Sequence, residues 1–326
     1  MDCHKIIVDC DSGTDDALAL AMLIGAHKRK KVEILAITCT HGNTSIENVI
    51  TNVFRVLGCC DALDIPVYKG AHSPLLTTEN TKIADEKKWH GFDGFGDVCN
   101  DKPDTSNLKE EHAVFAMHKI TKKFSGKVTL ICLAPLTNIA LTIKIHSGFI
   151  DTVQKLIIMG GNINGVGNTT SHAEFNFYTD PESAQIVIHN AAKKVWLLPW
   201  ETCLKSKITH EWRNTVFGQI DKPIVKLMNL VDRAVYDPED EIVKTYTPCD
   251  VFVAGIFLRP DIAKDVEMYH IDIELTGTHT RGQVVIDHLR AKDPNAYIIQ
   301  DLDWDTFKNL LMFAADPNPL NSQILL

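Results

Sequence analysis

The sequence predicts an α/β fold: an open, mostly parallel sheet with helices on both faces and a small antiparallel elaboration near the C-terminus. Apolar runs such as residues 5–10 and 127–134 are continuous and end in polar residues, as in strands that are buried on both faces. Helical spacing follows most of these runs, so strand and helix alternate along the chain. The sequence has no evident linker, repeat or low-complexity segment, which favours one domain over residues 1–326.

The expected elements follow one another in an order typical of a doubly wound sheet. The expected strands cover residues 5–10, 32–40, 65–70, 127–134, 153–161 and 194–200. The expected helices between them cover residues 15–29, 45–58, 136–145 and 180–190. Residues 268–275 and 282–288 read as the antiparallel pair, and residues 303–315 as an amphipathic helix. Sheets of this kind bind ligands at the carboxyl ends of their strands.

The overall composition argues against several classes of partner. The net charge is −9 and the pI is about 5.8, which disfavours binding to nucleic acid or to an anionic membrane surface. The longest apolar runs fall far short of the roughly 20 residues that a membrane span needs. The nine cysteines are scattered and form no C-x-x-C motif. This usage predicts free thiols in a reducing, cytoplasmic compartment.

Four aspartates are crowded at the end of the first expected strand, at positions 9, 11, 15 and 16. Asp9 and Asp11 are two residues apart, so the strand can direct both to one side. Asp15 and Asp16 fall in the first turn of the next helix, where the helix dipole contributes only about 0.3–1 kcal/mol per charge. A hard divalent cation with oxygen ligands would offset the repulsion among the four carboxylates. The simpler reading is that Asp15 or Asp16 caps the helix while the others face solvent.

Two kinds of chemistry fit a D-x-D motif beside a first strand. One is phosphoryl transfer through an aspartyl nucleophile, but phosphatases of that kind carry Thr or Val where this chain has Gly13, and they lack paired acids on the following helix. The other is a water activated by a metal ion, with a neighbouring carboxylate that takes its proton. The sequence favours the second chemistry.

Several longer motifs resemble the inosine-uridine-preferring nucleoside hydrolases. "DCDSGTDDALAL", "AITCTHGN", "PLTNIA", "IIMGG" and "AEFNFYTDPESA" occur in the order and at the spacing of that family, over nearly the whole chain. The resemblance implies an open α/β fold and a tightly held Ca²⁺ ion. It also implies hydrolysis of the N-glycosidic bond of ribonucleosides to ribose and free base, in nucleoside salvage, by a homodimer or homotetramer.

The resemblance assigns roles to individual positions. Asp11 matches the residue that both contacts the calcium and acts as general base for the attacking water, and Asp16 matches the bidentate ligand. The backbone carbonyl of Leu133 and the carboxylate of Asp250 match the remaining protein ligands. Asp9 matches the first acid of the family pattern, with a supporting role.

The same resemblance assigns the groups that hold the sugar. Asp15 and Asn43 match residues that bind the ribose 2′- and 3′-hydroxyls and the water at the metal. The loop before the Asp-Pro pair supplies the others, with one aromatic residue packed between them: Asn168, Glu174, Phe175 and Asn176. Fixed acids and amides at these hydroxyls would stabilise the oxocarbenium-like sugar of the transition state. Attack by water without a covalent intermediate predicts inversion at C1′.

Activation of the leaving base is where the chain departs from the best-known branch of the family, because Cys249 stands where that branch has a histidine. A thiol with a pKa near 8.5 is a poor substitute for an imidazole acid, and a small buried residue at a helix start is an equally good reading. His90 matches a second family histidine near the base. Other side chains could contact the base: Trp89, Phe92, Trp200, Tyr236 and Tyr246.

Two other residues have simple readings. His41 either lines the site or has a packing or hydrogen-bonding role. Ser12 replaces the proline of the family pattern in a turn that should tolerate the change.

Two alternative functions stay open at this point. One is a non-catalytic ribose- or nucleoside-binding protein that kept the metal site and lost the acid at position 249. The other is a Mg²⁺-dependent phosphatase. Each function predicts a different result. A nucleoside hydrolase releases a free base, a binding protein binds a nucleoside without turnover, and a phosphatase releases phosphate.

Overall fold

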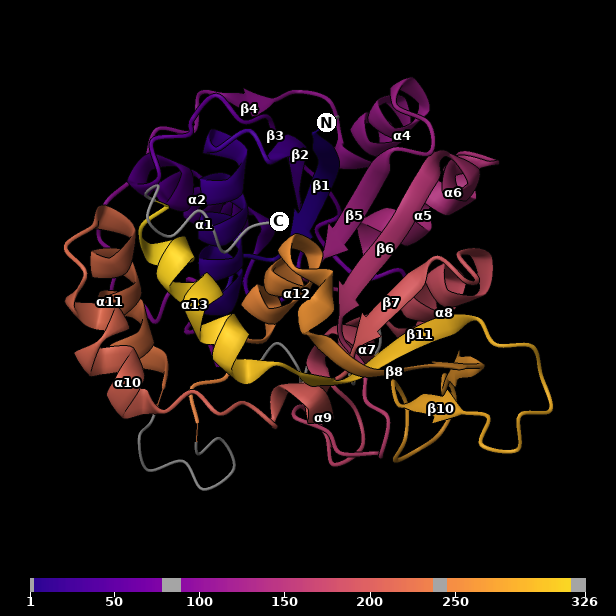
Figure 1. The fold of residues 1–326 in the computed structure, drawn as a ribbon. Coiled ribbons are helices and arrows are strands. Elements are labelled where there is room, and N and C mark those ends of the chain that lie inside the picture. Colours follow the sequence, from indigo (N-terminus) through magenta and orange to yellow (C-terminus); the bar gives the residue numbers. More distant parts are fainter. Residues whose placement is uncertain (1–2, 78–88, 237–244, 318–326) are drawn as a thin grey trace.

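A nine-stranded sheet forms the centre of the molecule, in the order β4-β3-β2-β1-β5-β6-β7-β11-β8 (Figure 1). The structure is a computed structural model, and it describes residues 3–77, 89–236 and 245–317. β8 runs antiparallel to β11, and the other neighbouring strands are parallel. β9 and β10 form a separate antiparallel pair in which Ile271 faces Ile286. The predicted fold class, including the antiparallel elaboration, is confirmed.

The strands and helices have the following bounds. The strands are β1 (His4–Cys10), β2 (Val32–Cys39), β3 (Val67–Lys69), β4 (Leu108–Lys109), β5 (Val128–Cys132), β6 (Val153–Met159), β7 (Val195–Leu198), β8 (Ala263–Tyr269), β9 (Ile271–Ile273), β10 (Val284–Ile286) and β11 (Ala296–Leu302). The α-helices are α1 (Thr14–Lys28), α2 (Ile46–Cys59), α4 (Ala113–Lys123), α5 (Thr137–Ile145), α6 (Phe149–Thr152), α7 (Phe175–Thr179), α8 (Pro181–Asn190), α9 (Trp200–Cys203), α10 (His210–Thr215), α11 (Pro223–Val235), α12 (Cys249–Leu258) and α13 (Trp304–Ala315). Two short 3₁₀ helices complete them, η1 (Phe217–Gln219) and η2 (Pro260–Ile262).

The two faces of the sheet have separate apolar cores. On β1, Ile6 and Val8 belong to the core under α1, α2, α12 and α13, whereas Ile7 belongs to the core under α4, α5 and α8. This alternation follows from the two-residue period of a strand. It also explains why the strand reads as a continuous apolar run, since both faces are covered (Figure 1).

Helix α1 is the element that brings the acidic residues to the sheet. Residues 16–26 of the helix are all buried, because it lies between the sheet and the helices α12 and α13. Gly13 is its N-cap, and the Asp16 carboxylate accepts the Gly13 N–H at 2.8 Å. The first turn therefore holds its acids at the carboxyl end of β1, where the helix dipole favours negative charge.

The helices α10, η1 and α11 form a flank beside α1 and α2, and α11 ends just before residues 237–244, which lie outside the described residues. The chain returns at residues 245–248 and enters α12 directly at Cys249. None of the helices in the described ranges is long and apolar enough to cross a membrane. The flank contacts the segment that leads into α12, through Asp232 and Tyr246.

Candidate functional site

The turn after β1 is tight and conformationally strained. Ser12 has a φ of 40°, in the left-handed region that few residues other than glycine adopt. Proline, whose φ is fixed near −65°, cannot take this conformation. The turn therefore differs in backbone from one built on the proline of the family pattern.

Asp11 is buried and is held by a neighbouring loop. The backbone N–H of Asn43 donates to Asp11 Oδ2 at 2.8 Å, and the Asn43 side-chain amide donates to Asp11 Oδ1 at 3.1 Å. A Cβ on Gly42 would lie 1.9 Å from Asp11 Oδ2, so only glycine lets this loop approach so closely. The Asn43 amide nitrogen also lies 3.4 Å from Asp16 Oδ2, which links the two acids.

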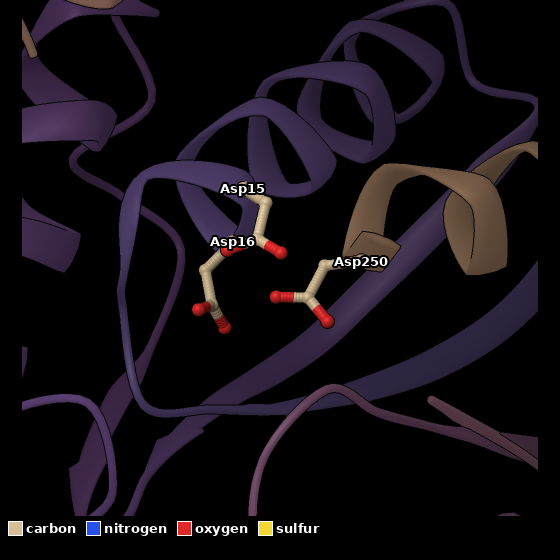
Figure 2. Close-up of side chains that lie close together, drawn as sticks. All are labelled: Asp15, Asp16 and Asp250. Atoms are coloured by element: carbon tan, nitrogen blue, oxygen red, sulfur yellow. The ribbon is translucent and has the colours of Figure 1, made fainter. Parts of the chain in front are cut away.

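Three carboxyl groups converge at the start of α1 and α12. Each of Asp15, Asp16 and Asp250 places an oxygen within 4.8 Å of the others (Figure 2). Asp15 Oδ1 and Asp16 Oδ1 are buried and have no hydrogen-bond partner among the described residues. We call Asp11, Asp15, Asp16 and Asp250 the acid cluster. Its hard oxygen donors and orphaned oxygens suit a divalent cation.

Burial and mutual repulsion raise the pKa of three carboxyl groups of the acid cluster: Asp11, Asp16 and Asp250. Burial, followed by the charge of Asp16, holds the pKa of Asp11 well above its usual range. Burial and the charges of its neighbours do the same to the pKa of Asp250. The pKa of Asp16 is raised to about 7, first by burial and then by Asp15. A cation at this point would reverse these shifts, because it favours the charged carboxylates.

His90 lies against the acid cluster. Its Nε2 is 3.7 Å from Asp15 Oδ1, and its Nδ1 accepts the backbone N–H of Thr14 at 3.2 Å. Because Nδ1 is an acceptor there, the neutral ring carries its proton on Nε2. Burial lowers the pKa of His90, partly opposed by the charge of Asp15, so the neutral form is favoured.

Cys249 is the first residue of α12 and is 5% exposed. Its thiol donates to the backbone carbonyl of Thr247 at 3.5 Å and lies beside the thiol of Cys203. Burial, followed by the interaction with Cys203, raises the pKa of Cys249 well above its usual range. The sulfur is therefore a protonated thiol at neutral pH.

A second group of predicted residues gathers at the ends of β5 and β6. The Asn176 amide donates to the Leu133 carbonyl at 3.1 Å and lies 3.3 Å from the Met159 carbonyl. The N–H of Leu133 donates to the carbonyl of Asp9 at 2.9 Å, which ties this group to β1. The charge of Asp15 contributes to the raised pKa of Glu174, so the two groups lie within electrostatic range of each other.

Glu174 is the N-cap of α7, and backbone groups occupy its carboxylate. Its two oxygens accept the N–H groups of Gly161 at 2.7 Å, Asn176 at 2.9 Å and Phe177 at 3.2 Å. Burial nevertheless raises its pKa to about 7. The hydrogen bonds give Glu174 a clear structural function, which the sequence analysis did not anticipate.

The remaining predicted residues of this loop are less buried. Asn168 is exposed and accepts the backbone N–H of Phe175 at 2.8 Å, while Phe175 is partly buried against Ala173 and Tyr178. Asp9 is buried, and its Oδ1 accepts from Thr38 of β2 at 2.6 Å and from Asn138 of α5 at 2.8 Å. These bonds fix the Asp9 carboxyl between β2 and α5.

The candidate base-contacting residues differ in position. Phe92 is 75% exposed, whereas Trp200 is buried with no hydrogen-bond partner for its indole nitrogen among the described residues. His41 is buried, with Nε2 3.0 Å from Thr137 Oγ1.

Three of the candidate base-contacting residues pack their rings together: Trp89, Tyr236 and Tyr246. A fourth ring, that of His210, lies against the two tyrosines and was not predicted from the sequence. The ring centroids of Tyr236 lie 6.2 Å from Trp89, 5.8 Å from His210 and 5.1 Å from Tyr246. We call these four residues the aromatic cluster. No local signal in the sequence marks His210.

A hollow of about 500 Å³ lies elsewhere, lined by Ser45, Ile46, Glu47, Lys69, Gly70, His72, Glu110 and His112. It contains none of the predicted site residues. Its lysine is already paired with Glu47 at 2.7 Å, so it is not a better candidate for the catalytic site.

The sequence profile of the family "Inosine-uridine preferring nucleoside hydrolase" matches residues 6–309. The chain belongs to this family. A pyrimidine-specific ribonucleoside hydrolase of Escherichia coli is 32% identical over 314 residues, which cover 94% of this chain and 96% of the relative. The inosine-uridine preferring nucleoside hydrolase of Leishmania major is 31% identical over 319 residues, which cover 96% of this chain and 98% of the relative.

Solved structures agree with this membership. An inosine-guanosine nucleoside hydrolase superposes with a TM-score of 0.85 at 26% identity, covering 96% of this chain and 98% of that chain. A purine-preferring ribonucleoside hydrolase from Gardnerella vaginalis has the same fold, with a TM-score of 0.84 at 24% identity over 95% of this chain and 98% of that one. The nucleoside hydrolase is thus an enzyme that cleaves N-ribosyl bonds of small-molecule nucleosides, as the sequence analysis predicted, and belongs to a metal-dependent family. The readings as a non-catalytic binding protein and as a phosphatase are set aside.

Proposed function

We propose that this nucleoside hydrolase depends on calcium and uses the acid cluster to activate the water that attacks C1′ of a ribonucleoside. The observation that carries the proposal is the convergence of the Asp15, Asp16 and Asp250 carboxyl oxygens within 4.8 Å, in a chain that matches the family over residues 6–309. Four acids share one small region, and a cation between them removes their repulsion.

The residues present suit calcium. Asp11, Asp16 and Asp250 would supply carboxylate oxygens, and Leu133 would supply its backbone carbonyl. The unpartnered Oδ1 of Asp16 supports this assignment, because a buried carboxylate oxygen without a donor is costly unless a cation or water satisfies it. When bound, calcium acts as a Lewis acid that makes a nearby water easier to deprotonate.

Asp11 acts as the general base in this proposal. The two N–H groups of Asn43 fix its carboxylate in one orientation, which a base needs to take a proton from a water in a defined place. The water proton goes to a carboxylate oxygen of Asp11, and the water oxygen forms the new bond to C1′. Attack from the face opposite the base gives inversion.

The sugar lies between the two groups of site residues. Asp15 and Asn43 hold the 2′- and 3′-hydroxyls, and Asn168, Glu174 and Asn176 approach from the α7 side, with Phe175 packed between them. Carboxylate and amide oxygens around the ring stabilise the positive charge that develops as the base departs. Since Glu174 already accepts three backbone N–H groups, it contributes a carboxyl group that is held in one place.

The leaving base accepts its proton or hydrogen bond from the side of the cluster where His90 and Cys249 lie. The neutral His90 ring presents its Nε2 proton beside Asp15, and the Cys249 thiol is protonated because burial raises its pKa. Neither group is a strong acid. We therefore assign leaving-group activation to hydrogen bonding by both groups, and expect each to contribute modestly.

Three further parts of the proposal concern the protein's setting. We propose that residues 1–326 form one domain, that the enzyme works in nucleoside and purine salvage in the cytoplasm, and that it assembles as a homodimer or homotetramer. Free cysteines support the reducing compartment, since all nine cysteines are free. The mass in solution, measured by light scattering, tests the assembly.

The test uses purified protein that is first stripped of metal with a chelator and then given calcium. Inosine, guanosine, adenosine, uridine and cytidine are supplied singly, and free base is followed by chromatography. We expect at least one nucleoside to be cleaved with calcium and the rate to fall by at least about 100-fold after chelation.

The matched control replaces an exposed aspartate outside the site. Asp11→Asn should lower kcat by about 10³-fold or more, whereas Asp151→Asn, an exposed residue of α6, should leave it unchanged. Cleavage that is indifferent to chelation and calcium would refute the calcium assignment. Full activity of Asp11→Asn would refute the assigned base.

A further inference from the structure

The aromatic cluster stands beside the acid cluster at the end where the leaving base must lie. Trp89 directly precedes His90, whose Nε2 is 3.7 Å from Asp15, and Tyr246 precedes Asp250 by four residues. The charges of Asp15 and Cys249 both contribute to the raised pKa of Tyr236, after burial and Tyr246. The cluster is therefore in electrostatic range of the proposed sugar-binding carboxylate and of the thiol.

A buried ion pair lies directly behind Tyr246. Arg213 Nε donates to Asp232 Oδ2 at 2.8 Å, Arg213 Nη2 lies 2.7 Å from the same oxygen, and the Tyr246 hydroxyl donates to it at 2.9 Å. The exposed fractions are 2% for Arg213, 7% for Asp232 and 2% for Tyr246. We call these three residues the buried triad. It joins α10, α11 and the segment that leads into α12.

The buried triad is supported on its far side. Arg213 Nη1 donates to Asn229 Oδ1 at 2.6 Å, and the guanidinium lies 5.0 Å from the ring centre of Phe217 and 5.6 Å from that of Tyr246. Asn229 in turn donates to the Gly218 carbonyl at 2.8 Å. The arginine is thus fixed by several contacts at once, so the carboxylate it holds is also fixed.

Stability alone does not account for such a group. Removing two charges from water is costly, and well-packed apolar residues are often at least as stabilising as a buried ion pair. The ion pair instead fixes the orientation of Tyr246. Arg213 holds the Asp232 carboxylate in one position, and this charged acceptor holds the Tyr246 hydroxyl. The backbone of Tyr246 is anchored independently, since its N–H donates to Ile208 and its carbonyl accepts from Ser206. The triad therefore fixes the ring.

We propose that Arg213 and Asp232 are positioning residues, which lock the Tyr246 ring and through it the aromatic cluster that receives the base of the nucleoside. The inference rests on the proposed function, and it assigns the base side of that site. The Tyr246 ring lies 5.1 Å from Tyr236 and 6.2 Å from His210, so an unlocked ring changes the surface that both present. The sugar side, built on α1 and the strand ends, does not depend on it.

The chain offers a matched control with the same chemistry on the surface. Tyr269 donates its hydroxyl to Glu267 at 2.7 Å, Arg290 Nη2 lies 3.1 Å from that same carboxylate, and the Arg290 guanidinium lies 5.2 Å from the Tyr269 ring centre. The Arg290 and Glu267 side chains are 66% and 50% exposed. β8, which carries Tyr269, is the edge strand of the sheet, far in strand order from β1.

The experiment compares Tyr246→Phe with Tyr269→Phe in the calcium-loaded enzyme. Two quantities are measured for each: kcat/KM for the best nucleoside, and the inhibition constant of an iminoribitol that mimics the ribosyl cation and carries no base. The first depends on both halves of the site and the second only on the sugar half. For Tyr246→Phe we expect kcat/KM to fall about 5- to 50-fold while the inhibition constant changes less than about threefold. Tyr269→Phe should change neither.

Each other outcome has a definite meaning. If kcat/KM for Tyr246→Phe stays within about twofold of wild type, or if iminoribitol binding weakens as much as kcat/KM falls, the positioning role is wrong. Should Tyr246→Phe fail to fold, Asp232→Asn replaces it, because it keeps the shape of the side chain and removes the charged acceptor that holds the tyrosine hydroxyl, and the same comparison applies. A wild-type enzyme that binds the iminoribitol yet cleaves no nucleoside would overturn the proposed function and this inference with it, whereas the first two results overturn the inference alone.

Discussion

The two ends of the site are held in different ways. The acid cluster lies at the carboxyl ends of buried strands and at two helix starts, and its acids are fixed by short bonds such as Asn43 to Asp11 and Gly13 to Asp16. The aromatic cluster lies on α10 (His210), at the end of α11 (Tyr236), on the approach to α12 (Tyr246) and on the loop before β4 (Trp89), and it borders residues outside the described ranges. In the proposed function, the first end holds the cation and the sugar, and every ribonucleoside has that sugar. The second end receives the base, in which nucleosides differ.

This difference suggests a division of labour. Chemistry that is the same for every substrate belongs on the rigid sheet, where small displacements are costly, and selectivity belongs on peripheral helices and loops. The relatives fit this view, since one is named pyrimidine-specific and another inosine-uridine preferring. Four measurements, from the largest expected effect to the smallest, would break or sharpen the comparison.

The largest loss of activity is expected for a change in the acid cluster. Asp16→Asn removes a charge from the acid cluster and one oxygen available to a cation, so calcium affinity and catalysis should fail together for every nucleoside. We expect kcat/KM to fall by about 10³-fold or more, with an equal factor for purine and pyrimidine substrates. Kinetics with both substrate classes and a calcium titration check this. A loss confined to one class of base would remove the division of labour.

The second effect concerns stability in the absence of metal. The pKa values of Asp9, Asp16 and Glu174 are each raised to about 7, mainly by burial, whereas unfolded acids titrate near 4. Raised acid pKa values give stability that is complete below the unfolded pKa and is lost as pH rises through about 7. Chelated protein should therefore melt at a lower temperature at pH 7.5 than at pH 5.

Calcium should reverse this order. Because it binds the deprotonated carboxylates, the rise in melting temperature that calcium produces should be larger at pH 7.5 than at pH 5. The Asp16→Asn variant should lose most of that rise. Equal calcium effects at the two pH values would show that these acids are not linked to the cation.

A smaller loss of activity is expected for Cys249, on the side of the site proposed to face the leaving base. Cys249→Ser replaces the thiol with a weaker acid of similar size, so it should lower kcat about tenfold on nucleosides and leave KM within about twofold. Cys99→Ser, a partly buried cysteine away from the site, is the control. An unchanged kcat would leave Cys249 with a packing function only, and His90 as the sole candidate for leaving-group activation.

The smallest effect concerns the turn after β1. Ser12 has a φ of 40°, so Ser12→Gly should relieve strain and raise the free energy of unfolding by up to about 1 kcal/mol with little change in activity. Ser12→Pro cannot adopt that φ and should lower both stability and kcat. Urea unfolding and steady-state kinetics measure the two variants. Wild-type behaviour of Ser12→Pro would show that the turn rearranges freely beneath Asp11.

The sequence alone predicted the parallel sheet, the antiparallel elaboration, the family and the crowding of acids after the first strand. These features are local or repetitive: Ile6, Ile7 and Val8 form one apolar run because both faces of β1 are covered, and Asp15 and Asp16 lie in the first turn of the adjoining helix. The resemblance to the family also assigned Asp250 to the same cation site as Asp16, although the two are more than 230 residues apart along the chain.

Only the tertiary structure decided how the aromatic cluster and the buried triad are built. Asp232 is 19 residues from Arg213 and 14 from Tyr246, and nothing near any of them marks a partner, yet the packing of α10 and α11 on η1 removes all three from water. The backbone also decided that Ser12 takes a conformation closed to proline and that Glu174 caps α7. The period of the apolar residues and the local motifs depend on residues that are neighbours in the sequence. The partner of a buried charge depends instead on which separate segments the fold brings together.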